Sequence, residues 1–313
     1  MHGWIKTKWL AIKTDQEVTE ILRKCPICTL DHFSEFEITD SADGYLYYRI
    51  CENCGLVFQS PRMSSKKLDA FYKEGYRTHA QESEEPTKKD LVMQRERAKY
   101  STSLITSKIT KVERHLDIGS SSGALLQAIQ EAYQSATVGI EPGDVYRRFS
   151  ESQGLTIYPS LSDLPNDIAP FDLITMMHVV EHLPDPVQYL RSLRSDYSLP
   201  RGYLLIEVPN LLEHEALELG HLYAFTPSTL RETVRQAGFE VVWVRTHGGF
   251  RSPILKLFIT LLAQVPVEPH QQVPTKSRPF GIRFRRNLGT LKRKLFTKFF
   301  PEWTWQSPRE LWD

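Results

Sequence analysis

Short apolar runs alternate with stretches of helical periodicity through the second half of the chain. Apolar runs of a few residues that end near Gly, Pro or Asn are typical of buried strands, whereas apolar residues three or four positions apart are typical of amphipathic helices. The strand-like runs are RHLDIG (114–119), TVGIEP (137–142), LTIYPS (155–160), FDLITMMHVV (171–180), GYLLIEVPN (202–210) and FEVVWVRT (239–246). This alternation predicts an α/β fold, in which a parallel sheet carries helices on both faces.

The chain before residue 112 has a different pattern. Four cysteines lie near its start and are followed by a helix-like stretch, SSKKLDAFYKEGY (64–76). A polar, acidic stretch, QESEEPTKKD (81–90), then has the composition of a linker or an exposed loop. The next stretch, DLVMQRERAKYSTSLITSKI (90–109), has the spacing of a helix. These changes divide the chain at about residue 112.

Glycine and serine dominate the loop after the first strand-like run, LDIGSSSGALL. The run ends near Asp117, and Gly119 and Gly123 flank three serines before a helical pattern begins. Glycine lets the backbone turn sharply and approach a ligand, while the next helix offers unpaired N–H groups. The loop has neither the G-x-G-x-x-G dinucleotide pattern nor the Gly-Lys-Ser/Thr of a phosphate-binding P-loop. Taken alone, it could also be a plain glycine-rich turn.

Acidic residues follow the next two strand-like runs. Glu141 lies about 20 residues past the glycine loop, where a carboxylate can bind both hydroxyls of a ribose. Asp163 and Leu164 follow the third run and could contact the edge and the face of an adenine. Three such signals after successive strands are harder to obtain by chance than one.

Six segments occur in an order that characterises one enzyme family: LDIGSSSG, GIEPG, SDLP, HVVEHLPDP, GYLLIEVPN and AGFEVV. With this order, residues 112–245 resemble the Rossmann-like class of S-adenosylmethionine-dependent methyltransferases. The loop departs from the family at Ser121, where many members have a glycine. The cofactor-binding residues that the resemblance implies are Asp117, Gly119, Ser120, Ser121, Gly123, Glu141, Asp163, Leu164 and His178.

The four cysteines form two C-x-x-C pairs, Cys25 with Cys28 and Cys51 with Cys54, separated by 22 residues. Four thiolates at this spacing can bind one tetrahedral zinc ion, and Gly55 suits the tight turn after the second pair. We interpret this zinc as structural, because so small a segment lacks a core of its own. The segment CENCGLVFQSPRMSSKKLDAFYKEGY is similar to a zinc-binding region ahead of the methyltransferase domain in some sugar C-methyltransferases. That resemblance implies that it helps to form the substrate side of the active site.

The stretch HVVEH (178–182) matches H-x-x-E-H, the inverted motif of a class of zinc proteases. That motif requires a helix that places both histidines on one face. The apolar run FDLITMM before it instead predicts a buried strand, and Pro184 and Pro186 after it disfavour a helix. We therefore predict that HVVEH lies at the carboxyl end of the fourth strand, where open α/β sheets bind ligands.

The family resemblance implies two alternative roles for the histidines at this edge. In ubiquinone-type O-methyltransferases and small-RNA 3′-end methyltransferases, E-x-x-E-H at this place binds a divalent metal, and the corresponding set here is His178, Glu181, His182 and His221. In sugar C-methyltransferases a histidine before an aromatic-rich segment is the general base, which here is His221 in HLYAFTP. His182 and His221 are thus the catalytic candidates, and a role in ordering the loop is the alternative for each. A second divalent metal is the alternative cofactor.

The segment 269–301 is basic and also rich in apolar residues. It contains nine lysines and arginines, no acidic residue, and phenylalanines and leucines between the charges. Such an amphipathic element could contact an anionic membrane or bind a phosphate-bearing substrate, and nucleic acid is a third alternative. An irregular extension with solvated charges is the fourth.

Composition limits the partners and the location. The chain of 313 residues is 41% hydrophobic and 25% charged, as in soluble globular proteins, and its net charge of +1 argues against a general attraction to nucleic acid. Lysines interrupt the apolar N-terminus, unlike a secretion signal, and ILKLFITLLA (254–263) is too short to span a bilayer. We therefore predict a cytoplasmic protein, peripheral to a membrane only if the C-terminal segment binds lipid.

These observations together predict an S-adenosylmethionine-dependent methyltransferase that acts on a small molecule, such as a sugar or a lipid-linked saccharide. The alternative is a zinc-ribbon protein that binds nucleic acid or modifies RNA and carries a methyltransferase-like domain. The predicted division is 1–80 for the zinc-ribbon region, 81–111 for a linker and helix, 112–250 for the cofactor-binding domain and 251–313 for the basic amphipathic extension.

Overall fold

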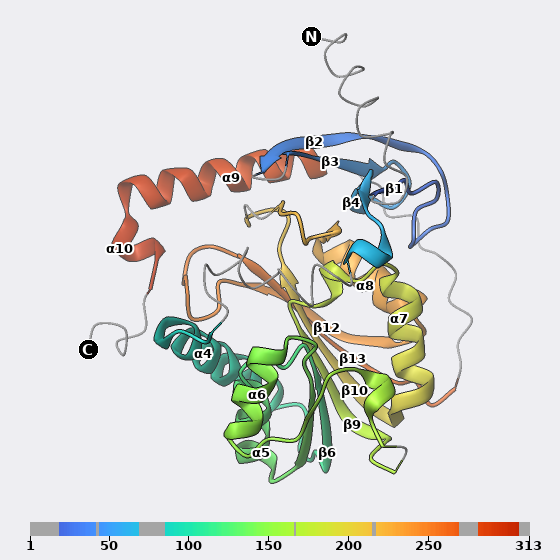
Figure 1. The fold of residues 1–313 in the computed structure, drawn as a ribbon. Coiled ribbons are helices and arrows are strands. Elements are labelled where there is room, and N and C mark those ends of the chain that lie inside the picture. Colours follow the sequence, from blue (N-terminus) through green and yellow to red (C-terminus); the bar gives the residue numbers. More distant parts are fainter. Residues whose placement is uncertain are drawn as a thin grey trace.

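The computed structural model describes residues 19–41, 44–68, 85–165, 167–214, 217–268 and 281–306. Figure 1 shows a large central sheet with helices on two sides and a smaller sheet at one end of it.

In the described part of the chain, the large sheet has seven strands, in the order β12, β13, β10, β9, β6, β7, β8. The strands are β6 (Arg114–Ile118), β7 (Ala136–Ile140), β8 (Ile157–Tyr158), β9 (Phe171–Met177), β10 (Ser198–Pro209), β12 (Glu240–His247) and β13 (Phe258–Gln264). Strand β13 is antiparallel to both of its neighbours, and the other neighbouring strands pair in parallel. This mostly parallel sheet confirms the predicted α/β fold.

Helices cover both faces of the large sheet. They are α4 (Lys88–Ile105), α5 (Ala124–Tyr133), α6 (Asp144–Ser152), α7 (Pro186–Ser192) and α8 (Pro227–Gln236). Successive side chains of a strand point to opposite faces. In β9, Leu173 therefore packs in one core with α4 and α5, while Ile174 and Met176 pack in another with α7 and α8. Two apolar layers thus fix the sheet and leave its strand ends for a ligand.

Strand β13 was not predicted from the sequence. Its residues Phe258 to Ala263 are all buried, because the strand lies between β10 and β12 and is covered on both faces. A strand of this kind reads as a continuous apolar run without polar alternation, which does not distinguish it from other buried segments. The sheet therefore continues beyond residue 250, where the sequence placed the start of a basic extension.

The smaller sheet joins the cysteine-containing region to the rest of the chain. Its order is β11, β4, β3, β2, and the strands are β2 (Phe33–Ser41), β3 (Gly44–Cys51), β4 (Val57–Gln59) and β11 (Tyr223–Ala224). Strand β11 follows β10 in the chain but pairs with β4, with Tyr223 opposite Phe58. A second small pair links β1 (Thr19–Glu20) with β5 (Arg62–Met63). Strand β11 comes from the part of the chain that forms the large sheet, which we call the large domain. Because β11 completes the smaller sheet, the N-terminal strands are hydrogen-bonded to the large domain and not joined to it by a linker alone.

Two further helices lie near the C-terminus, α9 (Ile282–Phe299) and α10 (Pro301–Thr304). Figure 1 shows α9 beside β2 and β3, away from the large sheet. None of the helices in the described ranges combines the length and the apolar character that a membrane span requires. Helix α4 confirms the helix predicted for 90–109, whereas the helix predicted for 64–76 is described only at 65–68 and otherwise lies outside the described residues.

Candidate functional site

The glycine loop forms a tight turn between β6 and α5. Gly119 and Gly123 have φ values of 74° and 77°, in the left-handed region that favours glycine. A Cβ atom on Gly119 would lie 2.6 Å from a methyl of Val179, so this position also has no room for a side chain. The N–H groups of Gly119 and Ser120 donate to the Ile140 carbonyl oxygen of β7, at 2.8 and 2.9 Å. These contacts hold the loop at the carboxyl edge of the sheet.

Glu141 lies directly after β7 and faces the same loop. One carboxylate oxygen accepts the Ser121 N–H at 2.8 Å, and the other accepts the Gly143 N–H at 2.9 Å. The residue is 5% exposed, whereas Ser120 has a buried hydroxyl with no hydrogen-bond partner in the described structure. The structure thus brings the predicted loop and the predicted ribose-binding carboxylate together, beside a polar group that a ligand could satisfy.

Asp117 is buried at the end of β6. It accepts a hydrogen bond from Thr175 on the neighbouring strand at 2.6 Å, and the Thr175 hydroxyl is 2.8 Å from Nε2 of His115. Burial raises the pKa of Asp117 to about 7 and lowers the pKa of His115 to about 3. Because the Thr175 hydroxyl gives its one proton to Asp117, the neutral imidazole donates from Nε2 to Thr175. These two hydrogen bonds fix the orientation of the aspartate.

The predicted adenine residues lie at the margin of the sheet. Asp163 is exposed on a short 3-10 turn, η1 (Leu161–Asp163), and accepts a hydrogen bond from Ser160 at 2.6 Å. Leu164 is half-buried and packs against the main core. Their contact with an adenine stays a prediction.

His178 follows β9 with a φ of 58°, which is uncommon for a residue other than glycine. Its Nδ1 lies 3.4 Å from Glu181 and its Nε2 lies 3.2 Å from Glu207 on β10. Burial and Arg97 would lower the pKa of His178, but these two carboxylates raise it above its usual value. His178 thus lies between two carboxylates, and each of its ring nitrogens faces one of them. The segment after it, η2 (Val180–His182), is one 3-10 turn, which confirms that HVVEH is not a protease-type helix.

Glu181, His182 and His221 form a buried cluster at the same edge. One potential ligand atom from each residue lies within 4.8 Å of the others. Neither oxygen of Glu181 makes a hydrogen bond within the described chain, although the residue is 1% exposed. Burial favours a neutral Glu181, but His178 and the imidazoles of His182 and His221 lower its pKa to about 2. An ionised carboxylate beside two imidazoles has the donor set of a divalent metal site.

The tautomer of His182 also suits a metal ligand. Its Nδ1 lies 2.8 Å from the Gly220 carbonyl oxygen, which can only accept, so Nδ1 carries the proton and Nε2 the lone pair. Burial lowers the pKa of His182 to about 4, which keeps the ring neutral near pH 7. The rings of His182 and His221 lie 4.8 Å apart.

The cysteine-containing region fixes the turn that carries His221. The Gln59 side-chain amide lies 2.7, 3.2 and 2.9 Å from the carbonyl oxygens of Glu218, Leu219 and His221. The Tyr48 hydroxyl lies 3.0 and 2.8 Å from the first and last of these oxygens. Both side chains are buried, so they hold the turn without competition from water. The predicted role of the N-terminal region on the substrate side of the site stays a prediction.

Sequence reasoning missed a group of residues around Glu207. This carboxylate is 1% exposed and also contacts Arg97 of α4 at 3.6 Å and the Thr260 hydroxyl at 3.1 Å. Nε2 of His247 lies 2.6 Å from the same hydroxyl. Burial would raise the pKa of Glu207, but His178, Arg97 and His247 lower it to about 2. The sequence feature that could have identified this group is Glu207 itself, a single acidic residue inside the apolar run GYLLIEVPN.

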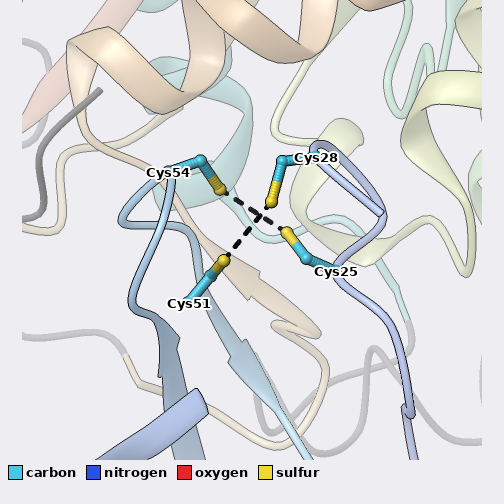
Figure 2. A group of neighbouring side chains, drawn as sticks. All are labelled: Cys25, Cys28, Cys51 and Cys54. Atoms are coloured by element: carbon cyan, nitrogen blue, oxygen red, sulfur yellow. Dashed lines mark hydrogen bonds between the residues drawn. The ribbon is translucent and has the colours of Figure 1, made fainter. Parts of the chain in front are cut away.

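The four cysteines meet in one buried cluster (Figure 2). Sγ of Cys25 lies 3.5 Å from Sγ of Cys54, and the same distance separates Cys28 from Cys51. A disulfide would require about 2.05 Å, whereas sulfurs around a tetrahedral zinc lie about 3.8 Å apart. Hydrogen bonding from Cys25 and Cys54 lowers the pKa of the Cys51 thiol, although burial raises it. The spacing and the free thiols are compatible with a zinc site made of four cysteines.

Comparison with known proteins gives one family match. Residues 88–244 match a family model described as a methyltransferase domain. The ubiquinone biosynthesis O-methyltransferase of Actinobacillus pleuropneumoniae serotype 7 (strain AP76) is 35% identical over 106 residues, in a match that covers 30% of this chain and 45% of that enzyme. The chain therefore matches about half the length of this curated relative.

A solved structure shares the fold. The 1,6-didemethyltoxoflavin-N1-methyltransferase of Burkholderia thailandensis, solved with 1,6-didemethyltoxoflavin and S-adenosylhomocysteine, aligns with a TM-score of 0.51 and 15% identity over 67% of this chain and 96% of that one. An S-adenosylmethionine-dependent methyltransferase of Archaeoglobus fulgidus aligns with a TM-score of 0.46 and 20% identity over 54% of this chain and 94% of that one.

Proposed function

The chain belongs to the Rossmann-like, S-adenosylmethionine-dependent methyltransferases, and we propose that it transfers a methyl group from S-adenosylmethionine to a small molecule. One observation carries the proposal. The glycine turn after β6 and the Glu141 carboxylate after β7 face each other at the carboxyl edge of a parallel sheet. Cofactors with a ribose bind at this edge in open α/β sheets.

The cofactor site that we propose uses the predicted residues. The turn residues Gly119, Ser120, Ser121 and Gly123 would surround the methionine part together with Asp117. When the cofactor binds, the Glu141 carboxylate would release the backbone N–H groups of Ser121 and Gly143 and accept hydrogen bonds from the ribose hydroxyls instead. Asp163 and Leu164 would meet the adenine. For His178 we propose that the backbone borders the cofactor, since both ring nitrogens face carboxylates.

Binding of S-adenosylhomocysteine, measured by isothermal titration, tests this proposal. We expect Glu141→Ala to weaken binding by about tenfold or more, because it removes the carboxylate opposite the turn. Glu151→Ala is the matched control, since Glu151 is exposed on α6, and should bind as the wild type does. Absence of binding by the zinc-loaded wild type would contradict the proposal.

For the acceptor side we propose a divalent cation held by Glu181, His182 and His221. The support is the buried carboxylate without a hydrogen bond beside two imidazoles. Such a cation would lower the pKa of an acceptor hydroxyl. The protein would bind and align the acceptor and remove its proton while the methyl carbon bonds to the acceptor and separates from sulfur. The alternative is that His221 alone accepts this proton as general base, with His182 orienting the turn.

We propose a hydroxyl-bearing acceptor, such as a sugar or a lipid-linked saccharide. Neighbouring hydroxyls suit a divalent cation, which prefers oxygen ligands alongside its protein ligands. The curated relative is named for O-methylation in ubiquinone biosynthesis, which agrees with transfer to oxygen. The nucleic-acid alternative gains no support from the cysteine-containing region, because its sheet is completed by β11 and built into the large domain.

We also propose that Cys25, Cys28, Cys51 and Cys54 bind a structural zinc ion. Each pair makes a knuckle turn, in which Thr29 N–H donates to the Cys25 carbonyl and Gly55 N–H to the Cys51 carbonyl, at 2.8 and 2.9 Å. The reducing cytoplasm predicted from the sequence would keep the thiols available to the metal. The zinc would stabilise the loops at the end of the small sheet and take no part in methyl transfer.

A further inference from the structure

Helix α9 carries a continuous apolar stripe on its surface. Five large residues along it are spaced by four, three, four and four positions, which places them on one face of a helix. They are Phe284, Leu288, Leu291, Leu295 and Phe299, with exposed fractions of 70%, 56%, 53%, 46% and 61%. Phe300, between the two helices, and Trp303 in α10 are also exposed, at 54% and 73%. Most of the exposed large apolar residues in the described ranges lie here, and such concentration marks an interaction surface.

The opposite face of α9 is fixed to the protein. A Cβ atom on Gly289 would collide with the carbonyl group of Leu212, so the helix packs closely at this point. Nε of Arg286 lies 2.9 Å from Glu37 on β2, and Nζ of Lys292 lies 3.1 Å from Glu213. These buried and half-buried contacts set the rotation of the helix. The apolar stripe therefore faces outward as a property of the fold.

Basic residues border the stripe on both sides. At 3.6 residues per turn, Arg285 lies along one border, and Lys294 and Lys298 lie along the other. All three are exposed. No acidic residue occurs between residues 269 and 301 to offset them. The surface thus combines a narrow apolar centre with positive edges.

We propose that α9 and α10 bind the surface of an anionic membrane. The apolar stripe would enter the boundary between headgroups and acyl chains, and the bordering cations would contact lipid phosphates, as in interfacial amphipathic helices. Nucleic acid fits less well, because its backbone requires cations at the centre of the surface, where this helix has phenylalanine and leucine. The inference concerns a surface outside the proposed active site and does not depend on methyl transfer.

Vesicle sedimentation tests the proposal with the full-length, zinc-loaded chain. We expect binding to vesicles of phosphatidylcholine mixed with phosphatidylglycerol, weaker binding to phosphatidylcholine alone, and a decrease with salt because counterions screen the charges. Leu288→Ser combined with Leu291→Ser should reduce partitioning by about tenfold or more, since two large apolar side chains leave the interface. Val267→Ser, at a residue that is 68% exposed elsewhere, is the matched control and should bind normally.

A second pair of variants tests the charges. Lys294→Gln combined with Lys298→Gln should weaken binding to anionic vesicles severalfold and leave binding to neutral vesicles unchanged. Lys88→Gln combined with Lys89→Gln removes two exposed charges at the start of α4 and should change neither. All substituted side chains are on the surface, so thermal unfolding and S-adenosylhomocysteine binding should stay at wild-type values.

Three outcomes would overturn the proposal. The first is no binding to either vesicle. The second is a dimer, detected by light scattering, that Leu288→Ser with Leu291→Ser converts to a monomer, because the stripe would then cover a second copy of the chain. The third is salt-sensitive retention of RNA or DNA that the lysine variants lose and the leucine variants keep, without vesicle binding.

Discussion

Glu181 differs from the other buried carboxylates at the carboxyl edge of the sheet. Glu207 accepts a hydrogen bond from Thr260, and Asp117 accepts one from Thr175. Glu181 has only an ion pair with His178 within the described structure, and its oxygens lie beside the rings of His182 and His221. The neighbouring histidines favour the ionised form, and the two oxygens, which accept no hydrogen bond in the described structure, could bind a cation.

We therefore predict that Glu181→Gln weakens binding of a divalent cation to the zinc-loaded protein. Mn²⁺ is the probe, and the free ion is followed by electron paramagnetic resonance. The neutral amide keeps the size of the side chain but removes the charge that the cation requires, so the affinity should fall by about a hundredfold. Glu131→Gln, at an exposed site on α5, should bind Mn²⁺ as the wild type does.

A lack of Mn²⁺ binding by the wild type would favour the general-base alternative. In that case His221→Gln should remove the limb of the pH–rate profile that reports a base, while binding of S-adenosylhomocysteine persists. If the cation binds, the same variant should instead lower Mn²⁺ affinity. The two roles of His221 are thus separated by one substitution and two measurements.

The small sheet contacts the turn that carries His221, on the proposed acceptor side of the site. Strand β4 pairs with β11, and Gln59 at the end of β4 binds the carbonyl oxygens of the turn that precedes β11. His221 and Gly220, which positions His182, both belong to that turn. The N-terminal strands therefore act as a template for residues that are more than 150 positions away in the sequence.

We predict that Gln59→Leu lowers the free energy of unfolding by about 3 kcal/mol, because three buried carbonyl oxygens lose the hydrogen bonds from the Gln59 amide. The variant should also weaken Mn²⁺ binding at Glu181, His182 and His221 by about tenfold, since the turn is no longer held. Urea denaturation and Mn²⁺ titration give the two values. Gln153→Leu, at an exposed residue after α6, should change neither. A loss of stability with unchanged Mn²⁺ affinity would show that Gln59 does not position the site.

The position of each residue in its strand explains which parts of the site could be predicted. Gly119, Glu141 and HVVEH were found because each lies at the end of a strand that the apolar pattern reveals. Gln59 was not, because its role depends on β4 meeting β11, and no local pattern encodes the pairing of strands so far apart. Strand β13 was missed because its apolar run stands outside the alternation of strand-like and helical patterns, and a continuous apolar run alone does not distinguish a buried strand from another buried segment.

Across the whole molecule, the two halves of the proposed active site depend on different parts of the chain. The cofactor turn and Glu141 are held by β6, β7 and α5, all within the large domain. The turn with His221 is held by Tyr48 and Gln59. These two residues lie on β3 and β4, the strands on either side of the turn with Cys51 and Cys54. The cysteines lie in the same core as residues of β4 and β11, so loss of the metal would loosen both strands.

Removal of zinc should therefore affect the two halves unequally. We predict one zinc per chain by elemental analysis, and a lower thermal unfolding midpoint after chelation or in Cys51→Ser, because metal binding contributes to folding. Mn²⁺ affinity at the acceptor side should fall by about tenfold or more, whereas S-adenosylhomocysteine affinity should change by less than about threefold. Addition of zinc to the chelated wild type should restore both the midpoint and Mn²⁺ binding. A parallel loss of S-adenosylhomocysteine binding would mean that the N-terminal strands also support the cofactor side. The link would be the β1–β5 pair, where Arg62 donates to the Pro184 carbonyl oxygen in the loop after β9 at 3.0 Å.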